Sequence, residues 1–230
     1  MGKITVAIDG YSSTGKSTIA KQLAKALNYI YVDTGAMYRA VTLYAIQHNY
    51  VGDQEDIAGL VNDLPDIKLK FVPNKALEIS EMHLNGKNVE REIRNMEVSS
   101  HVSKVATIPE VRHKLVEMQQ QMDTEKGIVM DGRDIGTVVF PDAELKLFMT
   151  ASPEARATRR YKELLERGEV VSYEEVLENV QKRDFIDSTR KTSPLRKADD
   201  AIEFDNSDMG LAEQFERVFD YTKRIIAEKS

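Results

Sequence analysis

The sequence of 230 residues contains no cysteine, so it forms no disulfide, offers no catalytic thiol and holds no cysteine-ligated zinc ion. It has no apolar run near the length of a membrane span, and its first predicted strand starts at Ile4, which leaves little room for a cleavable leader. It also lacks a basic excess: the net charge is -6 and the pI is near 5.4, whereas proteins that bind DNA or RNA usually carry a basic face. We therefore expect a cytoplasmic protein that works without nucleic acid or membrane partners.

The chain has no internal repeat, low-complexity tract or flexible linker, and its length suits one α/β domain with smaller attached parts. Short apolar segments alternate with helical patterns, which predicts a five-stranded parallel sheet flanked by helices. The predicted strands lie within Ile4–Asp9, Ile30–Gly35, Gly127–Gly136, Glu144–Ala151 and Ala201–Ser207. A last helix is expected to extend to the C-terminus.

One segment departs from this alternation. From Ile67 to Val89 apolar and polar residues alternate, interrupted by Pro73-Asn74-Lys75 and by Asn85-Gly86, which is typical of a small antiparallel meander inserted into the fold. Two helices are predicted after it, at Asn95–Ala106 and Glu110–Glu125, separated at Pro109.

The segment GYSSTGKS, from Gly10 to Ser17, follows the first predicted strand and precedes a helix with Ile19, Leu23 and Leu27 at helical spacing. Strand, glycine-rich turn and helix are the setting of a Walker A loop, whose amides cradle phosphate oxygens at a helix N-terminus. Lys16 would reach the β- and γ-phosphates and the Ser17 hydroxyl would ligate Mg²⁺. The alternative is a glycine turn that binds nothing, which the flanking strand and helix disfavour. We predict an ATP site formed by Gly10, Tyr11, Ser12, Ser13, Thr14, Gly15, Lys16, Ser17 and Thr18.

Three predicted strands carry an aspartate near their carboxyl ends, at Asp9, Asp33 and Asp131. Ligands of open parallel sheets bind beyond the carboxyl ends of the strands, so we expect these three positions to face one crevice. Arg133 and Asp134 follow the third strand, where a functional pair is favoured over a surface salt bridge.

Basic residues gather later in the chain. Between Glu154 and Lys197 eleven lysines and arginines stand against nine acidic residues, which reverses the balance of the whole chain. Pro153 opens one predicted helix and a second starts near Tyr173; together they carry Arg156, Arg159, Arg160, Arg183, Asp187 and Arg190. Charged helices are usually solvated faces, but arginines that follow a phosphate loop favour a mobile lid.

A phosphate loop with an arginine-bearing helical hairpin fits phosphoryl transfer, in which the protein positions donor and acceptor and neutralises charge. Lysine, arginine and Mg²⁺ suffice, so we assign no general base. Arg39, near the start of the helix after the second strand, lies where amides favour an anion; on that stretch alone a solvated surface arginine is an equal alternative.

Five segments in chain order resemble those of the cytidylate kinases, specifically the longer bacterial type: GYSSTGKST, VDTGAMYR, DGRDIGTVVFPDA, the RATRR run and RDFIDSTR. The resemblance covers nearly the whole chain. It implies transfer of phosphate from ATP to CMP or dCMP with Mg²⁺, on the α/β P-loop NTPase fold of the nucleoside monophosphate kinases. It also implies a single domain with a core of residues 1–34, 107–151 and 198–230, an acceptor-binding part of residues 35–106 that includes the meander 67–89, and a lid of residues 152–197.

The resemblance further implies roles for residues at matching positions. The acceptor phosphate would meet Thr34, Arg39 and Arg133, the sugar would meet Arg183 and Asp187, and the cytosine would meet Ser103, Arg112 and Asp134. Cytosine has an amino donor at N4 and acceptors at N3 and O2, which a carboxylate and an arginine complement. The transferring phosphoryl group would be held by Lys16, Arg133, Arg156, Arg160 and Arg190, although spacing leaves open which of Arg159 and Arg160 points inward.

Four positions depart from the family pattern. Tyr11 and Ser13 stand where proline and glycine are frequent, and Phe185 and Ile186 lie in a lid segment that is often more polar. Two other readings remain: a kinase for UMP, AMP or a small metabolite alcohol, and a P-loop switch that controls a partner, although the guanine-reading NKxD pattern is absent. We expect a monomer whose partners are ATP and a cytidine nucleotide.

Overall fold

The protein is described by a computed structural model that places residues 2–52, 55–74, 79–123 and 126–229. Its strands are β1 (Thr5–Gly10), β2 (Ile30–Asp33), β3 (Leu69–Asn74), β4 (Ile79–Leu84), β5 (Lys87–Asn88), β6 (Ile128–Asp131), β7 (Leu145–Thr150) and β8 (Ile202–Asp205). Its α-helices are α1 (Lys16–Leu27), α2 (Thr34–Gln47), α3 (Ile57–Asp63), α4 (Met96–Val105), α5 (Pro109–Gln120), α6 (Pro153–Glu166), α7 (Tyr173–Thr189) and α8 (Leu211–Glu228). Three single turns are η1 (Leu64–Asp66), η2 (Glu92–Arg94) and the π-helical η3 (Ile135–Val139).

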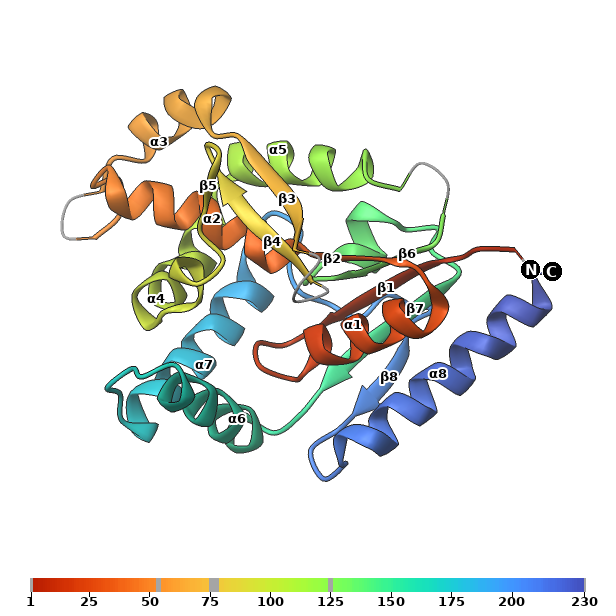
Figure 1. Ribbon diagram of the computed structural model, residues 1–230. Helices are drawn as coiled ribbons and strands as arrows, with labels where there is room; N and C mark the ends of the chain where they lie inside the picture. The colour runs from red at the N-terminus through yellow and green to blue at the C-terminus, as the bar shows by residue number, and fades with distance from the viewer. Residues whose placement is uncertain (1, 53–54, 75–78, 124–125, 230) are drawn as a thin grey trace.

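The main sheet has five parallel strands in the order β2-β6-β1-β7-β8 (Figure 1). β1 lies in the middle and all six of its residues are buried, which is why Val6, Ala7 and Ile8 at its centre are apolar on both faces of the sheet. The sequence-based prediction of a five-stranded parallel sheet is therefore confirmed.

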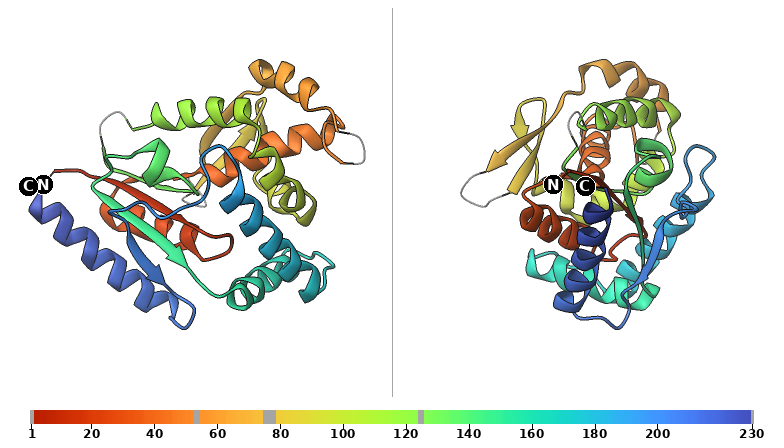
Figure 2. Two further views of the ribbon diagram at one scale, coloured as in Figure 1. Left: turned by 180° about the vertical axis from the view of Figure 1, so that it is seen from behind. Right: turned by 90° about the vertical axis from the view of Figure 1, so that its right-hand side faces the viewer.

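Helices cover both faces of this sheet. On one face Ile19 and Leu23 of α1 and Val218 of α8 pack with Val6 and other strand residues in one apolar cluster. On the opposite face the residues of η3 form a second cluster with β2 and β6. The two chain ends lie side by side in every view (Figures 1 and 2). Among the described residues, no helix combines the length and apolar character that crossing a membrane requires.

A third apolar cluster lies beside the sheet and is centred on α2, most of which is buried. Met37, Val41 and Tyr44, which recur at helical spacing along α2, all belong to it. The small sheet β3-β4-β5 is antiparallel and packs Met82 and Leu84 into the same cluster, which confirms the predicted meander.

Two segments differ from the sequence pattern. The segment Ile30–Gly35, which contains a predicted strand, leaves no room for a turn after β2: α2 starts directly at Thr34, because the Asp33 carboxylate accepts from the Ala36 amide at 3.0 Å and caps the helix. Pro73 was expected in a turn, but it lies in β3 opposite Ser80; β3 is an edge strand, where a missing N–H is tolerated.

The predicted turn position Asn74 is likewise part of β3, whereas Lys75 and the start of the next predicted strand, 76–78, lie outside the described residues. The two helices predicted on either side of Pro109 are present as α4 and α5; residues 106–108 separate them, and Pro109 is the first residue of α5, a position where proline is favoured. α5 ends at Gln120, and Glu125, its predicted end, also lies outside the described residues.

The predicted helical hairpin is present as α6 and α7. Ser152 caps α6 through the Ala155 amide, and Ser172 forms a capping box with Glu175 at the start of α7. α7 contacts α4, so the hairpin lies against the elements around α2 across the carboxyl ends of the strands (Figure 1).

Gly10 gives a test of the strand packing. Its φ is 145°, and a Cβ atom on it would lie 2.0 Å from the carbonyl oxygen of Met149 in β7. We expect Gly10→Ala to lower the free energy of unfolding by more than about 3 kcal/mol, measured by urea denaturation. Gly168→Ala is the control, because φ there is 81° but no atom lies within 4 Å; its loss should stay near 1 kcal/mol. Equal losses in the two variants would contradict this packing.

Candidate active site

The loop between β1 and α1 curls around the side chain of Lys16. Gly15 has φ 88° and Ser13 has φ 60°. Ser13, which stands where glycine is frequent, therefore adopts the left-handed conformation that glycine favours. The Lys16 ammonium donates to the Tyr11 carbonyl oxygen and to Thr14 Oγ1, at 3.2 Å in the latter case. The loop thus has the form of a phosphate cradle with the lysine inside it.

The charge around Lys16 is unusual. Burial, and then repulsion from Arg133, lower the pKa of Lys16 well below its ordinary value, although Asp131 and Asp9 act in the opposite direction. A bound phosphate would supply the missing negative charge. The loop is therefore built to receive an anion.

Ser17 and Asp131 lie together below this loop. Ser17 Oγ donates to Asp131 Oδ2 at 2.9 Å, and the Tyr31 hydroxyl donates to Asp131 Oδ1 at 2.7 Å. Burial, followed by repulsion from Asp33, raises the pKa of Asp131 to about 6. A hydroxyl and a carboxylate in contact at a cavity are oxygen ligands of the kind that Mg²⁺ prefers. The sequence predicted the role of Ser17 but did not pair it with Asp131.

Asp9 does not line the crevice with the other two strand-end aspartates, so this part of the prediction is wrong. Its two carboxylate oxygens accept from the amides of Ile135 and Gly136, each at 2.8 Å. Burial raises the pKa of Asp9 to about 7, although these two hydrogen bonds lower it. Asp9 holds the start of η3, the turn that follows Arg133 and Asp134, against the central strand.

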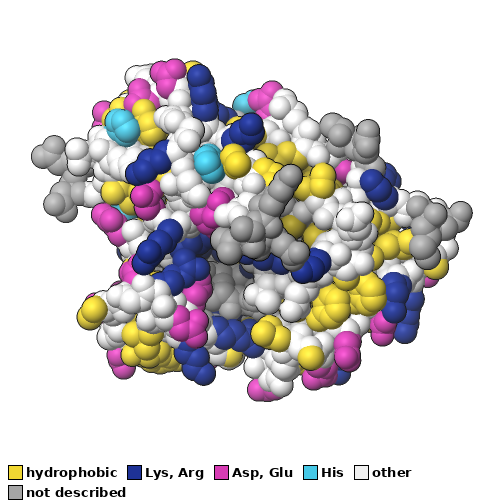
Figure 3. Space-filling view, in the orientation of Figure 1, with side chains coloured by type: hydrophobic (Ala, Val, Ile, Leu, Met, Phe, Trp, Pro, Cys, Tyr) yellow, Lys and Arg dark blue, Asp and Glu magenta, His cyan; other side chains and the backbone are white. Residues whose placement is uncertain are grey.

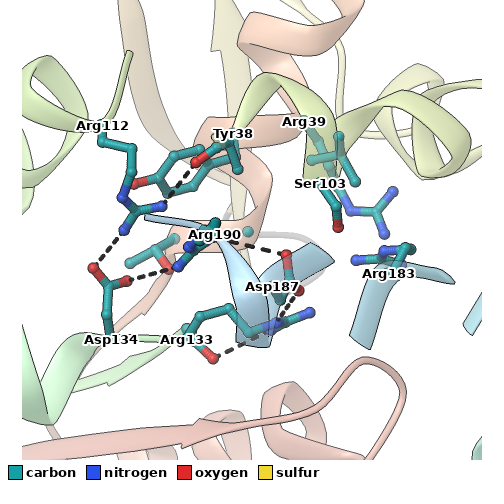
Figure 4. Close-up of a pocket in the computed structure, with 14 residues that line it drawn as sticks. Tyr38, Arg39, Ser103, Arg112, Arg133, Asp134, Arg183, Asp187 and Arg190 are labelled. Carbon is teal, nitrogen blue, oxygen red and sulfur yellow. Dashed lines mark hydrogen bonds and ion pairs between the residues drawn. The ribbon is translucent and has the colours of Figure 1, made fainter. Parts of the chain in front are cut away.

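A pocket opens between α2, α4, α7 and the loop after β6 (Figure 4). Its empty space, part of which is open to solvent, is about 430 Å³. All eight residues predicted for the acceptor line it: Thr34, Arg39, Ser103, Arg112, Arg133, Asp134, Arg183 and Asp187. Arg190 and Tyr38 line it as well. We call it the acceptor pocket.

One end of the acceptor pocket holds a buried ion pair between Arg112 Nη2 and Asp134 Oδ2. The guanidinium of Arg112 lies 5.3 Å from the centre of the Tyr38 ring and donates to the Ala106 carbonyl oxygen at 3.2 Å. Arg190 Nη2 lies 3.9 Å from the other oxygen of Asp134. This end therefore presents a carboxylate and a guanidinium in a fixed orientation.

Asp187 organises the other charges of the pocket. Its carboxylate accepts from Arg133 Nε at 2.9 Å and lies 3.7 Å from Arg190 Nη1. Although burial raises the pKa of Asp187, Arg133, Arg183 and Arg190 together hold it below its ordinary value. Burial, and then repulsion from Arg133, lower the pKa of Arg183 to about 10. Positive charge thus exceeds negative charge here, which favours an anionic ligand.

Several polar atoms around the pocket are left unsatisfied. Within the described part of the chain no hydrogen-bond partner reaches four buried atoms: Tyr38 OH, Arg112 Nε, Arg183 Nε and Arg190 Nη2. Buried polar groups normally have partners, so a ligand with polar edges would complete this site.

A second, larger cavity of about 1650 Å³ extends from the loop at Lys16 and is lined by Ser12 to Thr18, among other residues. Lysine and arginine side chains gather around a hollow between α4 and α6 (Figure 3). We call it the phosphate cavity. Gly35, Arg39, Gly132, Arg133 and Arg183 line both this cavity and the acceptor pocket, so the two cavities adjoin.

The arginines of the α6–α7 hairpin take different positions. Arg159 and Arg160 both line the phosphate cavity: Arg160 Nη2 donates to the Arg94 carbonyl oxygen at 2.7 Å, whereas Arg159 donates to the carbonyl oxygen of Asn206 at 2.7 Å. Arg190 lines the acceptor pocket instead.

Arg156 lines neither cavity in this structure. Its guanidinium donates to the carbonyl oxygens of Ala151 and Ser12 and forms an ion pair with Asp184 at 2.6 Å. The predicted contact with a transferring group would require this arginine to leave Asp184. Phe185, next to that aspartate, is one of the two apolar residues noted in this lid segment, and its side chain is 69% exposed.

Sequence reasoning missed Arg94 and Ser99. Arg94 Nη2 forms ion pairs with Asp33 and Glu90, each at 2.7 Å, and lines the phosphate cavity. Ser99 contacts Arg39 and Arg160. Both lie outside any recognisable motif. Glu90 is four residues from Arg94, but Asp33, Arg39 and Arg160 are distant in the sequence from the residues that they contact, so no local signal placed Arg94 and Ser99 at the site.

Comparison with known proteins agrees with this geometry. Residues 6–224 match the family model described as cytidylate kinase. A cytidylate kinase of Flavobacterium psychrophilum is 61% identical over 226 residues, covering 98% of this chain and 100% of that protein. Cytidylate kinases of Parabacteroides distasonis and Bacteroides thetaiotaomicron are 61% and 53% identical, over 93% and 99% of this chain and 94% and 100% of those proteins.

Proposed function

Because the chain belongs to the cytidylate kinase family, we propose that it transfers the γ-phosphoryl group of ATP to CMP or dCMP, giving ADP and CDP or dCDP. Such a reaction supplies pyrimidine nucleotides. The observation that carries the proposal is that the two cavities adjoin: the phosphate loop lines one, the Arg112–Asp134 pair lies in the other, and Arg39, Arg133 and Arg183 line both.

Cytosine is the base that fits the far end of the acceptor pocket. We assign the carboxylate of Asp134 to accept from N4 and Arg112 to donate to N3 or O2, with Ser103 on the neighbouring wall; their ion pair and their position in the lining support this assignment. Uracil would turn its O4 toward Asp134, and two oxygen acceptors repel one another. The pair therefore favours CMP over UMP.

The remaining lining residues suit the rest of the nucleotide. Arg39 and Arg133 line both cavities, and Thr34 lines the acceptor pocket next to Gly35, which also lines both; we assign Thr34, Arg39 and Arg133 to the acceptor phosphate. Arg183 and Asp187, on the wall formed by α7, are assigned to the sugar.

In phosphoryl transfer negative charge spreads over the oxygens of the migrating group, and the protein acts mainly by positioning and by neutralising charge. We assign that task to Lys16 and Arg133, aided by Arg160, Arg156 and Arg190 when residues 152–197 close as a lid. Closure would exclude water, which is a competing acceptor. The Ser17 hydroxyl and the adjacent Asp131 carboxylate would hold Mg²⁺, which supplies positive charge to the β- and γ-phosphates.

We further propose that one copy of the chain suffices, since both cavities are formed within it. Its parts would be a core of residues 1–34, 107–151 and 198–230, an acceptor-binding part of residues 35–106 and the lid. An acidic chain without cysteine suits work in the reducing cytoplasm on small nucleotides rather than on nucleic acid.

The reaction is tested by following ADP release with CMP, dCMP, UMP, AMP and shikimate as acceptors. We expect kcat/KM for CMP or dCMP to exceed the other values by at least about tenfold, because the carboxylate of Asp134 and the guanidinium of Arg112 complement the N4 donor and the N3 and O2 acceptors of cytosine. Best turnover with any other acceptor would overturn the substrate assignment. Slow ATP hydrolysis with no response to any acceptor, together with a partner bound only in the ATP form, would instead indicate a nucleotide switch.

Base selectivity is tested separately with Asp134→Asn, which keeps the shape of the side chain and removes its charge. We expect the ratio of kcat/KM for CMP to that for UMP to fall about tenfold, because attraction for N4 and repulsion of O4 both weaken. The ratio does not depend on the folded fraction, which matters because Arg112 loses its buried partner.

Asp184→Asn is the matched control for that experiment, since Asp184 is also an arginine-paired aspartate but lines neither cavity. Its ratio should equal that of the unchanged protein. An unaltered ratio in Asp134→Asn would remove Asp134 from base recognition.

A further inference from the structure

Ser99 lies on α4 one turn before Ser103, so the two side chains share a face of the helix. Ser103 lines the acceptor pocket, whereas Ser99 is fully buried and is part of neither cavity wall. Ser99 therefore does not touch a ligand in either cavity. Any influence of it on the reaction must act through other side chains.

Those side chains are two arginines from separate parts of the chain. Ser99 Oγ accepts from Arg39 Nη1 at 3.0 Å and from Arg160 Nη2 at 3.1 Å, and it donates its proton to the Asn95 carbonyl oxygen at 2.9 Å. A hydroxyl has one proton and two lone pairs, so every hydrogen-bonding site of Ser99 is used. Arg39 belongs to α2 and Arg160 to α6. A single oxygen thus joins the acceptor side to the hairpin.

The two guanidinium groups repel one another. Burial, followed by repulsion from Arg183, Arg160 and Arg94, lowers the pKa of Arg39 well below its ordinary value. None of the ion pairs within the described residues includes Arg39; its other hydrogen bond is to the Ile93 carbonyl oxygen, at 3.2 Å. The orientation of Arg39 before an anion arrives therefore depends on neutral oxygens, and Ser99 is the one that it shares with Arg160.

We propose that Ser99 is a positioning residue for phosphoryl transfer. Its hydroxyl oxygen accepts hydrogen bonds from both Arg39 and Arg160, and so holds Arg160 of the hairpin beside Arg39, which we assign to the acceptor phosphate. The proposal rests on the kinase function proposed above. It goes beyond that function in naming a residue that touches neither substrate.

The test is Ser99→Ala, assayed for kcat and for KM toward CMP and ATP separately. We expect kcat/KM for CMP to fall about tenfold, because two hydrogen bonds to charged groups are lost. KM for ATP should change less than about twofold, since the loop around Lys16 is untouched. A smaller folded fraction would instead lower the apparent kcat and leave both KM values unchanged. Urea denaturation measures the loss of folding independently.

Ser100→Ala is a matched control. Ser100 also donates to the carbonyl oxygen four residues earlier, Met96, at 3.0 Å, but it is exposed and its other partner is Asn179, not an arginine. Its kinetics should match those of the unchanged protein. If Ser99→Ala behaves like this control, or raises KM for ATP as much as KM for CMP, the proposal is overturned.

Coupling to the hairpin is tested by combining Ser99→Ala with Arg160→Lys, which retains the charge but loses the forked donor. If Ser99 acts through Arg160, its effect should shrink in the Arg160→Lys background; effects that simply multiply would overturn this link. Absence of CMP kinase activity in the unchanged protein would refute the proposed function itself. Full activity there with no effect of Ser99→Ala would refute only the role of Ser99.

Discussion

The constraint on which this structure depends is the burial of many positive side chains around few negative ones. Arg39, Arg112, Arg183 and Arg190 are all buried at the acceptor pocket, and Asp134 and Asp187 are the buried carboxylates that line it with them. Removing charges from water is costly unless they are paired, so an excess of buried cations leaves the site ready for an anion. Phosphate groups supply that charge. Binding of nucleotides thereby completes an arrangement that the chain alone leaves unbalanced.

The fold makes this crowding possible through the carboxyl ends of parallel strands. β1 leads into the phosphate loop, β2 into Thr34, and β6 into Arg133 and Asp134, so three separate stretches deliver side chains to one edge of the sheet. Asp9 fixes the turn after Asp134 by two backbone hydrogen bonds, and Asp33 caps α2 and pairs with Arg94. Two of the strand-end aspartates thus support the site mechanically, while Asp131 holds the Ser17 hydroxyl.

The sequence predicted the sheet and the phosphate loop because short local patterns indicate both: buried apolar runs indicate the strands, and a glycine, lysine and serine at fixed spacing indicate the loop. The lining of the acceptor pocket followed from family resemblance, since Ser103 and Arg112 carry no chemical signal of their own. Contacts that depend on packing were beyond such reasoning. Arg156 forms an ion pair with Asp184, 28 positions away, and Ser99 accepts a hydrogen bond from Arg160, 61 positions away. Asp33 is both the last residue of β2 and the N-cap of α2, and the strand pattern alone did not show that its side chain caps the helix.

The central claim is that donor and acceptor lie in one continuous space, with the migrating phosphoryl group between Lys16 and the arginines that line both cavities. Steady-state inhibition by a single molecule in which adenosine and cytidine are joined through a chain of phosphates tests it most directly. We predict inhibition competitive with ATP and also competitive with CMP, because one molecule would fill both cavities at once. Competition with only one of the two nucleotides would contradict the account.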